Sequence, residues 1–442
     1  LFLVYIMPID PISSKRASAT PSSLYVGGPT VDPDLLANPS ILRIEIMANP
    51  PVQLSLQTAQ SKSPPVSTHV PSSLTPPVTP IAKERPPRST PSPFQDPKAE
   101  QTPSISKDNA SPLQFTDDLE ICHDENNRSI EFGRGVWSMV YKARSLPRPQ
   151  TNLPGTPPSS PTSRSQVLAV KAPLRRDARP VLNAEALTLT RLTLTQGHEQ
   201  YVVPFHGYHA ELGALVMSAI PTSLATYIED QSKLARTRQP TTATMFDPVQ
   251  GPASYQELAR KLITGLNWLH QVAGVVHGDI KPQNILLRPI DTDDCDEALD
   301  FPYEPLYADF SATVDIPADA DAPVDTTRAS MSSFTPPFTA PEMLASLTSS
   351  EMAPTPASDV FSLAATLLAA ATGDLLLYPN MNHRLRLEMA RAGHQIIDFA
   401  RSGVSGSRVP RDGFVERIVK PAVAKDPAMR VTTPEWAELA SA

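Results

Sequence analysis

Apolar residues are distributed unevenly along the chain, and their spacing separates a long unpatterned stretch from a patterned remainder. Residues 1–112 are rich in Pro, Ser and Thr and contain few aromatic residues. Such a stretch cannot bury enough apolar surface to offset the entropy that a chain loses on ordering. We therefore expect a disordered tail with polyproline character over residues 1–112, and ordered structure from about Leu113 onward.

The first part of the ordered region has the alternation of apolar and polar residues that is typical of β-strands. Strands are predicted at residues 130–143 (two strands around a glycine turn), 167–171, 201–207 and 212–220. A helix is predicted at residues 180–194. The proline-rich residues 146–166 and the acidic residues 288–305 are expected to be inserted loops. The acids of the second loop follow no calcium-loop pattern, which favours a solvated insertion over a metal site.

Helical periodicity dominates the rest of the chain. Residues 255–272 carry leucines at the spacing of one helix face. The apolar run 360–378 is nearly long enough to span a bilayer, but Gly373 and Asp374 interrupt it, so we favour a buried core helix. Shorter helices are predicted at residues 223–229 and 434–439, and a polar loop at residues 236–252.

Composition narrows the class of protein. The chain has 442 residues with 50 prolines, and its net charge is −8. Together with the lack of a Lys/Arg run, this charge argues against nucleic acid and against a membrane surface as partners. Cys122 and Cys295 lie far apart, which fits a reducing compartment, the cytoplasm or the nucleus. The apolar Leu1–Met7 is short and lacks a basic flank, so we expect neither a signal peptide nor a membrane anchor.

One short polar stretch, residues 277–284 with the sequence HGDIKPQN, combines the groups that phosphoryl transfer needs. Asp279 can accept a proton from a hydroxyl, Lys281 can neutralise charge on a phosphoryl group, and Asn284 offers an oxygen to a hard divalent cation. Catalysis of this reaction is mostly positioning and charge stabilisation. The alternative interpretation is a polar turn before a buried strand.

Residues 277–284 resemble the catalytic loop of eukaryotic-type protein kinases, with Gly278 in the place of the usual Arg. Six further motifs occur in the order of that family, two before this loop and four after it. They are a glycine-rich turn, a Val-Ala-x-Lys strand, Asp-Phe-x, Ala-Pro-Glu, an apolar helix bearing Asp359, and the late Arg430. The resemblance covers roughly residues 113–440. It implies an α+β, bilobal protein kinase fold with a small, mostly-β N-lobe (about 113–220), a larger, mostly-α C-lobe (about 221–442), and ATP between them.

The resemblance assigns contacts with ATP to the predicted glycine turn. Gly133 and Gly135 would let backbone amides approach the phosphates, because no Cβ is in the way. Val140 would lie over the adenine ring, and Ser138 stands where the family usually has its third glycine. An ordinary hairpin turn is the alternative interpretation of these residues.

Four more residues are implied to contact the nucleotide or to support it. Lys171 would bind the α- and β-phosphates and pair with Glu185, the one acidic residue of the helix predicted at 180–194. Met217 would lie behind the adenine, and Ala219 would belong to the hinge. The alternatives are solvated surface charges for the first pair and an ordinary core residue for Met217.

Asp309-Phe310-Ser311 resembles the Asp-Phe-Gly motif of the family. The resemblance implies that Asp309 binds Mg²⁺ together with Asn284, and that Phe310 packs beneath the helix predicted at 180–194. Ser311 replaces the glycine, which should narrow the backbone freedom at this position but removes no metal ligand.

Residues 334–342 resemble the segment that ends a kinase activation loop. Thr335 matches the threonine that contacts the catalytic aspartate and lysine in serine/threonine kinases, which implies Ser/Thr specificity over Tyr. In the family, Glu342 would pair with Arg430, and Asp359 would hold the backbone amides of the catalytic loop.

Gly278 also bears on regulation, because an Arg at this position often clamps a phosphorylated activation loop in the family. We therefore predict that activity does not strictly require phosphorylation at Thr326, Thr327, Ser330, Ser332 or Ser333.

These patterns predict an ATP- and Mg²⁺-dependent protein serine/threonine kinase that acts through Asp279 and Lys281. A pseudokinase scaffold, mildly favoured by Ser138 and Ser311, is one alternative, and a small-molecule kinase of related fold is another. The expected partners are protein substrates with Ser or Thr acceptors. The Ser-Pro and Thr-Pro pairs in the tail indicate further partners, which are proline-recognising modules or proline-directed kinases.

Overall fold

The computed structural model describes residues 111–146, 167–238, 241–242, 244–290, 299–317, 335–345, 353–378 and 382–442. The predicted tail lies outside the described residues except for its last two, and the predicted loop 146–166 lies outside them except for Leu146. The centre of the acidic loop, residues 291–298, and all five proposed phosphorylation sites also lie outside them.

The first part of the described chain forms a six-stranded antiparallel sheet. Its strands are β1 (Asp118–Ile121), β2 (Glu131–Arg134), β3 (Ser138–Leu146), β4 (Val167–Pro173), β5 (Phe205–His209) and β6 (Ala214–Ser218). They lie in the order β1-β3-β4-β6-β5, and β2 also pairs with β3. The central strand β4 places Lys171 between Val140 of β3 and Leu215 of β6.

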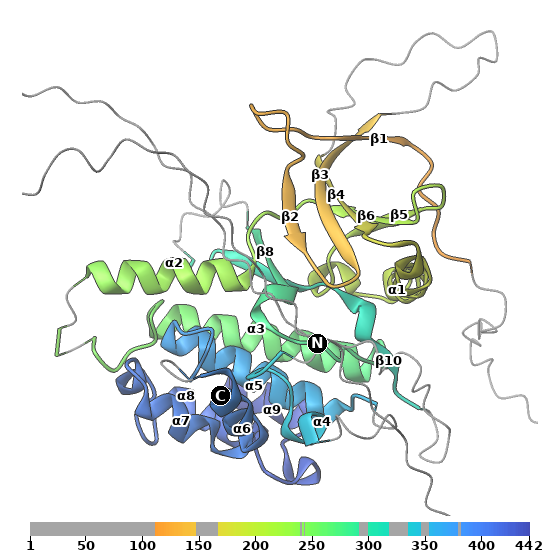
Figure 1. Ribbon diagram of the computed structural model, residues 1–442. Coiled ribbons are helices and arrows are strands. Elements are labelled where there is room, and N and C mark those ends of the chain that lie inside the picture. The colour runs from red at the N-terminus through yellow and green to blue at the C-terminus, as the bar shows by residue number, and fades with distance from the viewer. Residues whose placement is uncertain are drawn as a thin grey trace, which may run out of the picture. The chain divides into compact units, whose positions relative to one another are not determined.

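Helix α1 (Arg179–Thr193) packs against β5 and β6 (Figure 1). Its buried apolar residues, including Leu182 and Leu189, join the same core as Leu215. The predicted strands and the helix over 180–194 are therefore confirmed. Strand β5 begins at Phe205 rather than at residue 201, because the preceding residue is Pro204, which has no N–H to donate to a strand ladder.

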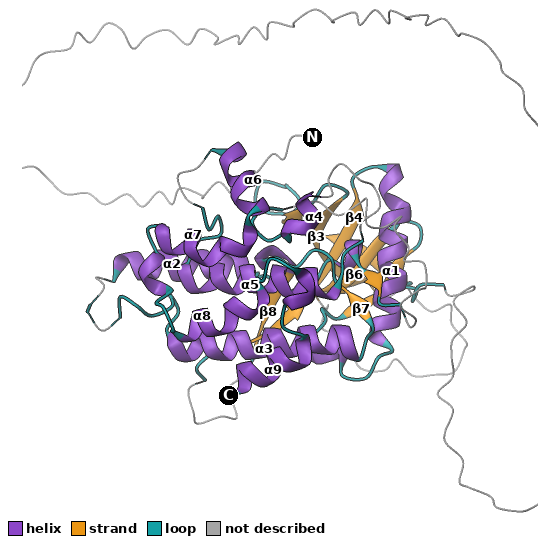
Figure 2. Ribbon diagram, turned by 90° about the horizontal axis from the view of Figure 1, so that it is seen from below, coloured by secondary structure: helices purple, strands orange, loops and turns teal. Residues whose placement is uncertain are grey.

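Helices dominate the chain after β6, and short strand pairs accompany them (Figures 1 and 2). The helices are α2 (Leu224–Thr237), α3 (Pro252–Gln271), α4 (Pro341–Ala345), α5 (Pro356–Thr372), α6 (His383–Arg391), α7 (Ile396–Ser402), α8 (Phe414–Val419) and α9 (Thr433–Ser441). The strands are β7 (Val275–Val276), β8 (Ile285–Pro289), β9 (Tyr303–Tyr307) and β10 (Val314–Asp315). Strand β8 pairs with β9, and β7 pairs with β10.

Two long helices form the centre of this helical part. Helix α3 buries the leucines whose spacing predicted it, and Figure 2 shows α9 lying along it. Every residue of α5 from Ser358 to Thr372 is buried, and Gly373 ends the helix with a left-handed φ of 71°. The prediction of a core helix in the run 360–378 is confirmed. In the part of the chain that the structure describes, no helix has the length and apolar character needed to cross a membrane.

Helix α2 is longer than predicted. The sequence pattern indicated a helix over 223–229, whereas α2 begins after its N-cap Ser223 and continues to Thr237. Its buried residues are confined to the first two turns, at Leu224, Ala225 and Ile228. The later turns are partly or fully exposed, so they carry little apolar periodicity from which their helical structure could be predicted.

Candidate active site

The catalytic loop, residues 277–284, joins β7 to β8 and is held from beneath by α5. The carboxylate of Asp359 accepts hydrogen bonds from the backbone N–H groups of His277 (2.7 Å) and Gly278 (2.9 Å). Asp359 is 1% exposed and also lies 3.1 Å from Nε2 of His270 on α3. The role that the resemblance assigned to Asp359 is confirmed. The contact with His270 was not predicted, because nothing in the sequence around this helical histidine indicates a partner on α5.

Gly278 has a backbone conformation that other residues rarely adopt. Its φ is +82°, and a Cβ built on it would lie 2.5 Å from the carbonyl oxygen of Ala312 and 3.0 Å from Cγ of Pro354. An L-residue here would be strained and would displace the neighbouring backbone. Gly278 is therefore required by the conformation of the loop itself.

Asp279 lies at the centre of a small polar network. Nζ of Lys281 lies 2.7 Å from its Oδ2, and Nδ2 of Asn284 donates to the same oxygen at 3.0 Å and to the backbone carbonyl of Asp279 at 2.8 Å. Burial raises the pKa of Asp279 above its usual value despite the nearby Lys281, and the charge of Asp309 adds to the rise. A carboxylate with a raised pKa is a better proton acceptor, as general-base chemistry requires.

A second network joins the sheet, α1 and the segment after β9. Nζ of Lys171 contacts both carboxylate oxygens of Glu185, at 2.8 and 2.7 Å, and Oδ1 of Asp309 at 2.8 Å. Burial acts to lower the pKa of Lys171, but the carboxylates of Asp309 and Glu185 outweigh it and raise the pKa above its usual value. Lys171 therefore stays protonated and presents a permanent positive charge.

The Asp-Phe-Ser segment is held tightly at its start. Asp309 has a left-handed backbone with φ of 62°, and the N–H of Phe310 donates to Oε1 of Glu185 at 3.2 Å. Phe310 is 1% exposed and lies in the core beside α1, as predicted. The hydroxyl of Ser311 donates to Oδ1 of Asp309 at 2.7 Å, a contact that the sequence did not indicate.

Asn284 and Asp309 have free oxygens that suit a hard cation. The side-chain nitrogen of Asn284 donates to Asp279, which leaves its oxygen as the end available to a ligand. Asn284 comes directly before β8 and Asp309 follows β9, so the pairing of these strands places both residues at the same end. Described residues contain no group of three or more His, Cys, Asp or Glu side chains suited to a metal. Mg²⁺ is usually held by one or two protein ligands together with phosphates and water, so this donor set fits it.

The glycine turn is less enclosed than the catalytic loop. Gly133 lies in β2, and a Cβ there would meet no atom within 4 Å. Gly135 donates its N–H to the carbonyl of Ser138 at 2.8 Å. Val140 is the Cα partner of Lys171, so the turn and the lysine belong to the same part of the sheet. These positions are compatible with the predicted contacts to the nucleotide, which remain predictions.

The two positions predicted near the adenine, Met217 and Ala219, lie at the C-terminal end of β6 and directly after it. Met217 is on β6, where its Cα is the partner of Ala169 and Phe205, and it is 8% exposed. The N–H of Ala219 donates to the carbonyl of Val167 at 3.5 Å. Met217 lies within β6, the strand that pairs with β4 at Lys171, and Ala219 comes directly after β6. Their proposed contacts with adenine also remain predictions.

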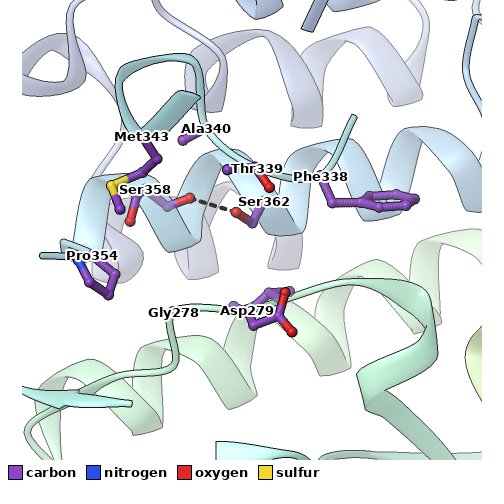
Figure 3. Close-up of a pocket in the computed structure, with 10 residues that line it drawn as sticks. Gly278, Asp279, Phe338, Thr339, Ala340, Met343, Pro354, Ser358 and Ser362 are labelled. Carbon is purple, nitrogen blue, oxygen red and sulfur yellow. Dashed lines mark hydrogen bonds between the residues drawn. The ribbon is translucent and has the colours of Figure 1, made fainter. Parts of the chain in front are cut away.

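The segment 335–345 lies against the catalytic loop. Nζ of Lys281 is 3.4 Å from the hydroxyl of Thr335, which is the lysine contact that the resemblance implied. A cavity of about 20 Å³ separates Phe338–Met343 from Gly278 and Asp279, with α5 behind it (Figure 3). This volume holds about one water molecule. The segment 335–345 and the catalytic loop are therefore closely packed here, and the cavity is too small for a substrate.

Glu342 and Arg430 form the predicted ion pair. The guanidinium of Arg430 makes two hydrogen bonds of 2.7 Å with the carboxylate of Glu342, and it also donates to the carbonyl of Ala357 at 2.8 Å. The side chain of Arg430 is 1% exposed. A two-point, buried contact of this kind fixes the segment that carries Thr335 against the helical part of the protein.

Comparison with known proteins agrees with the geometry of the loop. A family model described as "Protein kinase domain" matches residues 214–439. The serine/threonine-protein kinase PknK of Mycobacterium tuberculosis (strain CDC 1551 / Oshkosh) is 32% identical over 187 residues, which are 41% of this chain and 14% of that protein. PknK of strain ATCC 25618 / H37Rv and of Mycobacterium bovis give the same identity over the same length. The chain thus matches only a small part of these relatives, and the family match does not include Lys171 or Glu185.

Proposed function

The chain belongs to the protein kinase family, and on that premise we propose that it transfers the γ-phosphoryl group of ATP to Ser and Thr hydroxyls of protein substrates. One observation carries the proposal. Two networks, Lys171–Glu185–Asp309 and Lys281–Asp279–Asn284, lie close enough for the charge of Asp309 to raise the pKa of Asp279. A base, a permanent cation and the donors for a metal ion are thereby gathered at one place.

The proposed architecture is bilobal, with an N-lobe of about residues 113–220 and a C-lobe of about residues 221–442. The ion pair of 2.8 Å between Lys171 on β4 and Asp309 after β9 supports this division, because it joins the sheet to the helical part at a single polar site. ATP would bind there, with Gly133 and Gly135 over its phosphates. Val140, Met217 and Ala219 would surround the adenine.

Each polar residue of the site has a distinct task in the proposed mechanism. Asp279 orients the acceptor hydroxyl and takes its proton, which its raised pKa favours. Lys281, 2.7 Å from Asp279, stabilises the negative charge that develops on the phosphoryl oxygens. Lys171, kept protonated by its two carboxylate neighbours, orients the phosphates of the nucleotide.

Asn284 and Asp309 would hold Mg²⁺ through their free oxygens. When bound, the ion would neutralise part of the negative charge on the phosphates of ATP. The protein fixes these two ligands before the ion arrives, since Asn284 is held by Asp279 and Asp309 is held by Lys171. This preorganisation reduces the reorganisation that binding of the ion would otherwise require.

Specificity for Ser and Thr is proposed from the segment after the catalytic loop. Thr335 contacts Lys281, and the segment that bears it is fixed by the pair Glu342–Arg430. The PknK relatives that match the chain are named serine/threonine-protein kinases, which agrees with this assignment. A segment placed beside the base in this way would support an extended peptide substrate.

The test is transfer of radiolabelled phosphate from ATP to generic protein substrates, followed by identification of the modified residues. We expect phosphoserine and phosphothreonine. Asp279→Asn should lower the rate by about 1,000-fold, because it removes the proton acceptor, while a fluorescent ATP analogue should still bind. Undiminished activity in this variant would exclude Asp279 as the base.

A pseudokinase scaffold is the second candidate, and the replacement of two family glycines by Ser138 and Ser311 favours it. It predicts binding of partner proteins without transfer of phosphate. The same assay decides between the candidates, since a wild-type protein that is folded but transfers no phosphate to any protein or peptide would favour the scaffold. Transfer to a small molecule but never to protein would instead favour a small-molecule kinase.

We also propose an intracellular location, in the cytoplasm or nucleus, where ATP and protein substrates are available. Cys122 is a free thiol in the structure, which is compatible with a reducing compartment. The Ser-Pro and Thr-Pro pairs of residues 1–112 would add proline-directed kinases or proline-recognising modules as partners. Fluorescence microscopy of the tagged full-length protein tests the location.

A further inference from the structure

Ser311 and Lys171 donate to the same oxygen of Asp309. The hydroxyl of Ser311 lies 2.7 Å from Oδ1 and Nζ of Lys171 lies 2.8 Å from it. A carboxylate oxygen has two lone pairs, so two donors of this quality occupy Oδ1 fully. Among the described residues, no hydrogen-bond donor contacts Oδ2 of Asp309, and the Asp309 side chain is 37% exposed.

The backbone holds the serine hydroxyl where it can reach Asp309. Asp309 has the left-handed φ of 62°, and the residues after it form a short 3₁₀ turn, Phe310–Ala312. The N–H of Phe310 is bonded to Glu185, and its side chain is buried. Phe310, directly before Ser311, is thus held by its N–H and by its buried side chain, and this places the serine hydroxyl within hydrogen-bond distance of Asp309.

We propose that Ser311 is a positioning residue for the metal ligand Asp309, and that its hydroxyl, with Lys171, leaves Oδ2 as the atom that binds the divalent cation. The inference deepens the proposed function and rests on it. A glycine at position 311 has no side chain to perform this task. The departure from the family motif at this position thus supplies a hydrogen bond, in addition to restricting the backbone.

Three variants separate the hydroxyl from the backbone effect. Ser311→Ala removes the hydroxyl but keeps a Cβ, Ser311→Gly removes both, and Ser311→Thr keeps the hydroxyl. Loss of a residue that orients a metal ligand typically weakens metal binding by about 10- to 100-fold. Because Lys171 still holds Oδ1, we expect the lower end of that range for the Ala and Gly variants, and binding within about twofold of wild type for Thr.

The measurement is binding of Mn²⁺ followed by electron paramagnetic resonance, in the presence of a non-hydrolysable ATP analogue. It does not depend on phosphoryl transfer. Ser145→Ala is the matched control, because Ser145 donates to Asp117 at 2.9 Å in a similar Ser–Asp contact on β3. Its Mn²⁺ affinity should equal that of wild type, and Asp309→Asn should lose most of the metal binding.

Two results would overturn the positioning role alone. One is a Ser311→Ala variant that binds Mn²⁺ as wild type does while Asp309→Asn loses it. The other is weaker binding in Ser311→Gly only, which would assign the effect to the backbone. A wild-type protein that shows no nucleotide-dependent Mn²⁺ binding would overturn both this inference and the proposed function.

Discussion

The catalytic loop and the glycine turn contribute to the same proposed site, yet the protein supports them in opposite ways. In the catalytic loop, His277 is fully buried, and Asp359 accepts the N–H groups of His277 and Gly278. In the glycine turn, all four residues of β2 are exposed and Val136 is 57% exposed. The interior therefore determines the shape of the loop, whereas little besides pairing with β3 determines the shape of the turn.

This difference indicates whether a residue is needed for folding or for binding of the nucleotide. Residues of the catalytic loop are required by the folded protein itself, so changing them should alter stability as well as chemistry. Residues of the glycine turn are required, in our proposal, only by the nucleotide. Their substitution should leave folding unchanged and weaken binding of ATP.

Among the substitutions that compare the two regions, the largest effect on activity is expected for Lys281, beside the proposed base. Lys281→Ala removes the cation beside Asp279, and loss of one such charge stabiliser typically lowers kcat by about 100-fold. Asp279 acts as a base when deprotonated, so activity falls as the pH drops through its pKa. Lys281 lowers that pKa, whereas burial and Asp309 raise it. Its removal should therefore move the acid limb of the kcat/KM profile to higher pH.

The conservative control is Lys281→Arg, which keeps the positive charge near Asp279 and should keep the acid limb in place. Val140→Ala, in the region of the glycine turn, should raise the KM for ATP without moving the limb. An acid limb that stays at the same pH in Lys281→Ala would show that Asp279 is not the titrating base.

The second prediction concerns the support beneath the loop. Asp359→Asn replaces one acceptor oxygen by a nitrogen, so one of the two loop amides loses its partner in a fully buried site. Leaving a buried donor without its acceptor typically costs about 1–3 kcal/mol, and we expect a loss of this size in the free energy of unfolding. Chemical denaturation measures it. The exposed Asp230→Asn, which loses only a surface pair with Lys233, should change stability by less than about 0.5 kcal/mol.

Sequence patterns predicted the elements whose apolar residues are buried. The helical spacing in α3 corresponds to buried residues such as Leu262, whereas β4 was predicted from an alternation but is buried at four consecutive residues, Val170 among them. The second half of α2 was missed because its residues are partly or fully exposed and none is buried. The periodicity of apolar residues therefore predicted which residues are buried. It predicted secondary structure only for the helices and strands that have a buried face.

The site shows a similar division. The pairing of Glu342 with Arg430 was predicted because a family motif contains both residues. The contact of Ser311 with Asp309 depends on a left-handed backbone at Asp309, which no local sequence pattern indicates. Gly278 was interpreted only as a missing Arg, since the carbonyl of Ala312 that excludes a side chain is distant in the sequence.

The third prediction tests the comparison with one substitution in each region. Gly278→Ala places a methyl group on a residue with φ of +82° and within 2.5 Å of a backbone oxygen. The left-handed conformation alone typically costs an L-residue about 1–2 kcal/mol, and the loop must also shift. We expect at least this loss in the free energy of unfolding, measured by chemical denaturation, together with lower activity because the shift moves Asp279.

Gly133→Ala is the matched substitution in the glycine turn. The Cβ of an alanine at position 133 would meet no atom within 4 Å, and the φ of Gly133 is not positive, so the substitution adds no strain to the folded state. Replacing glycine at a compatible position typically leaves stability unchanged or raises it by up to about 1 kcal/mol, because the unfolded chain loses freedom. The new methyl group would instead stand where the phosphates are proposed to approach, so binding of an ATP analogue should weaken while the melting temperature holds. Equal losses of stability in Gly133→Ala and Gly278→Ala would refute the distinction, because both glycines would then be required by the fold.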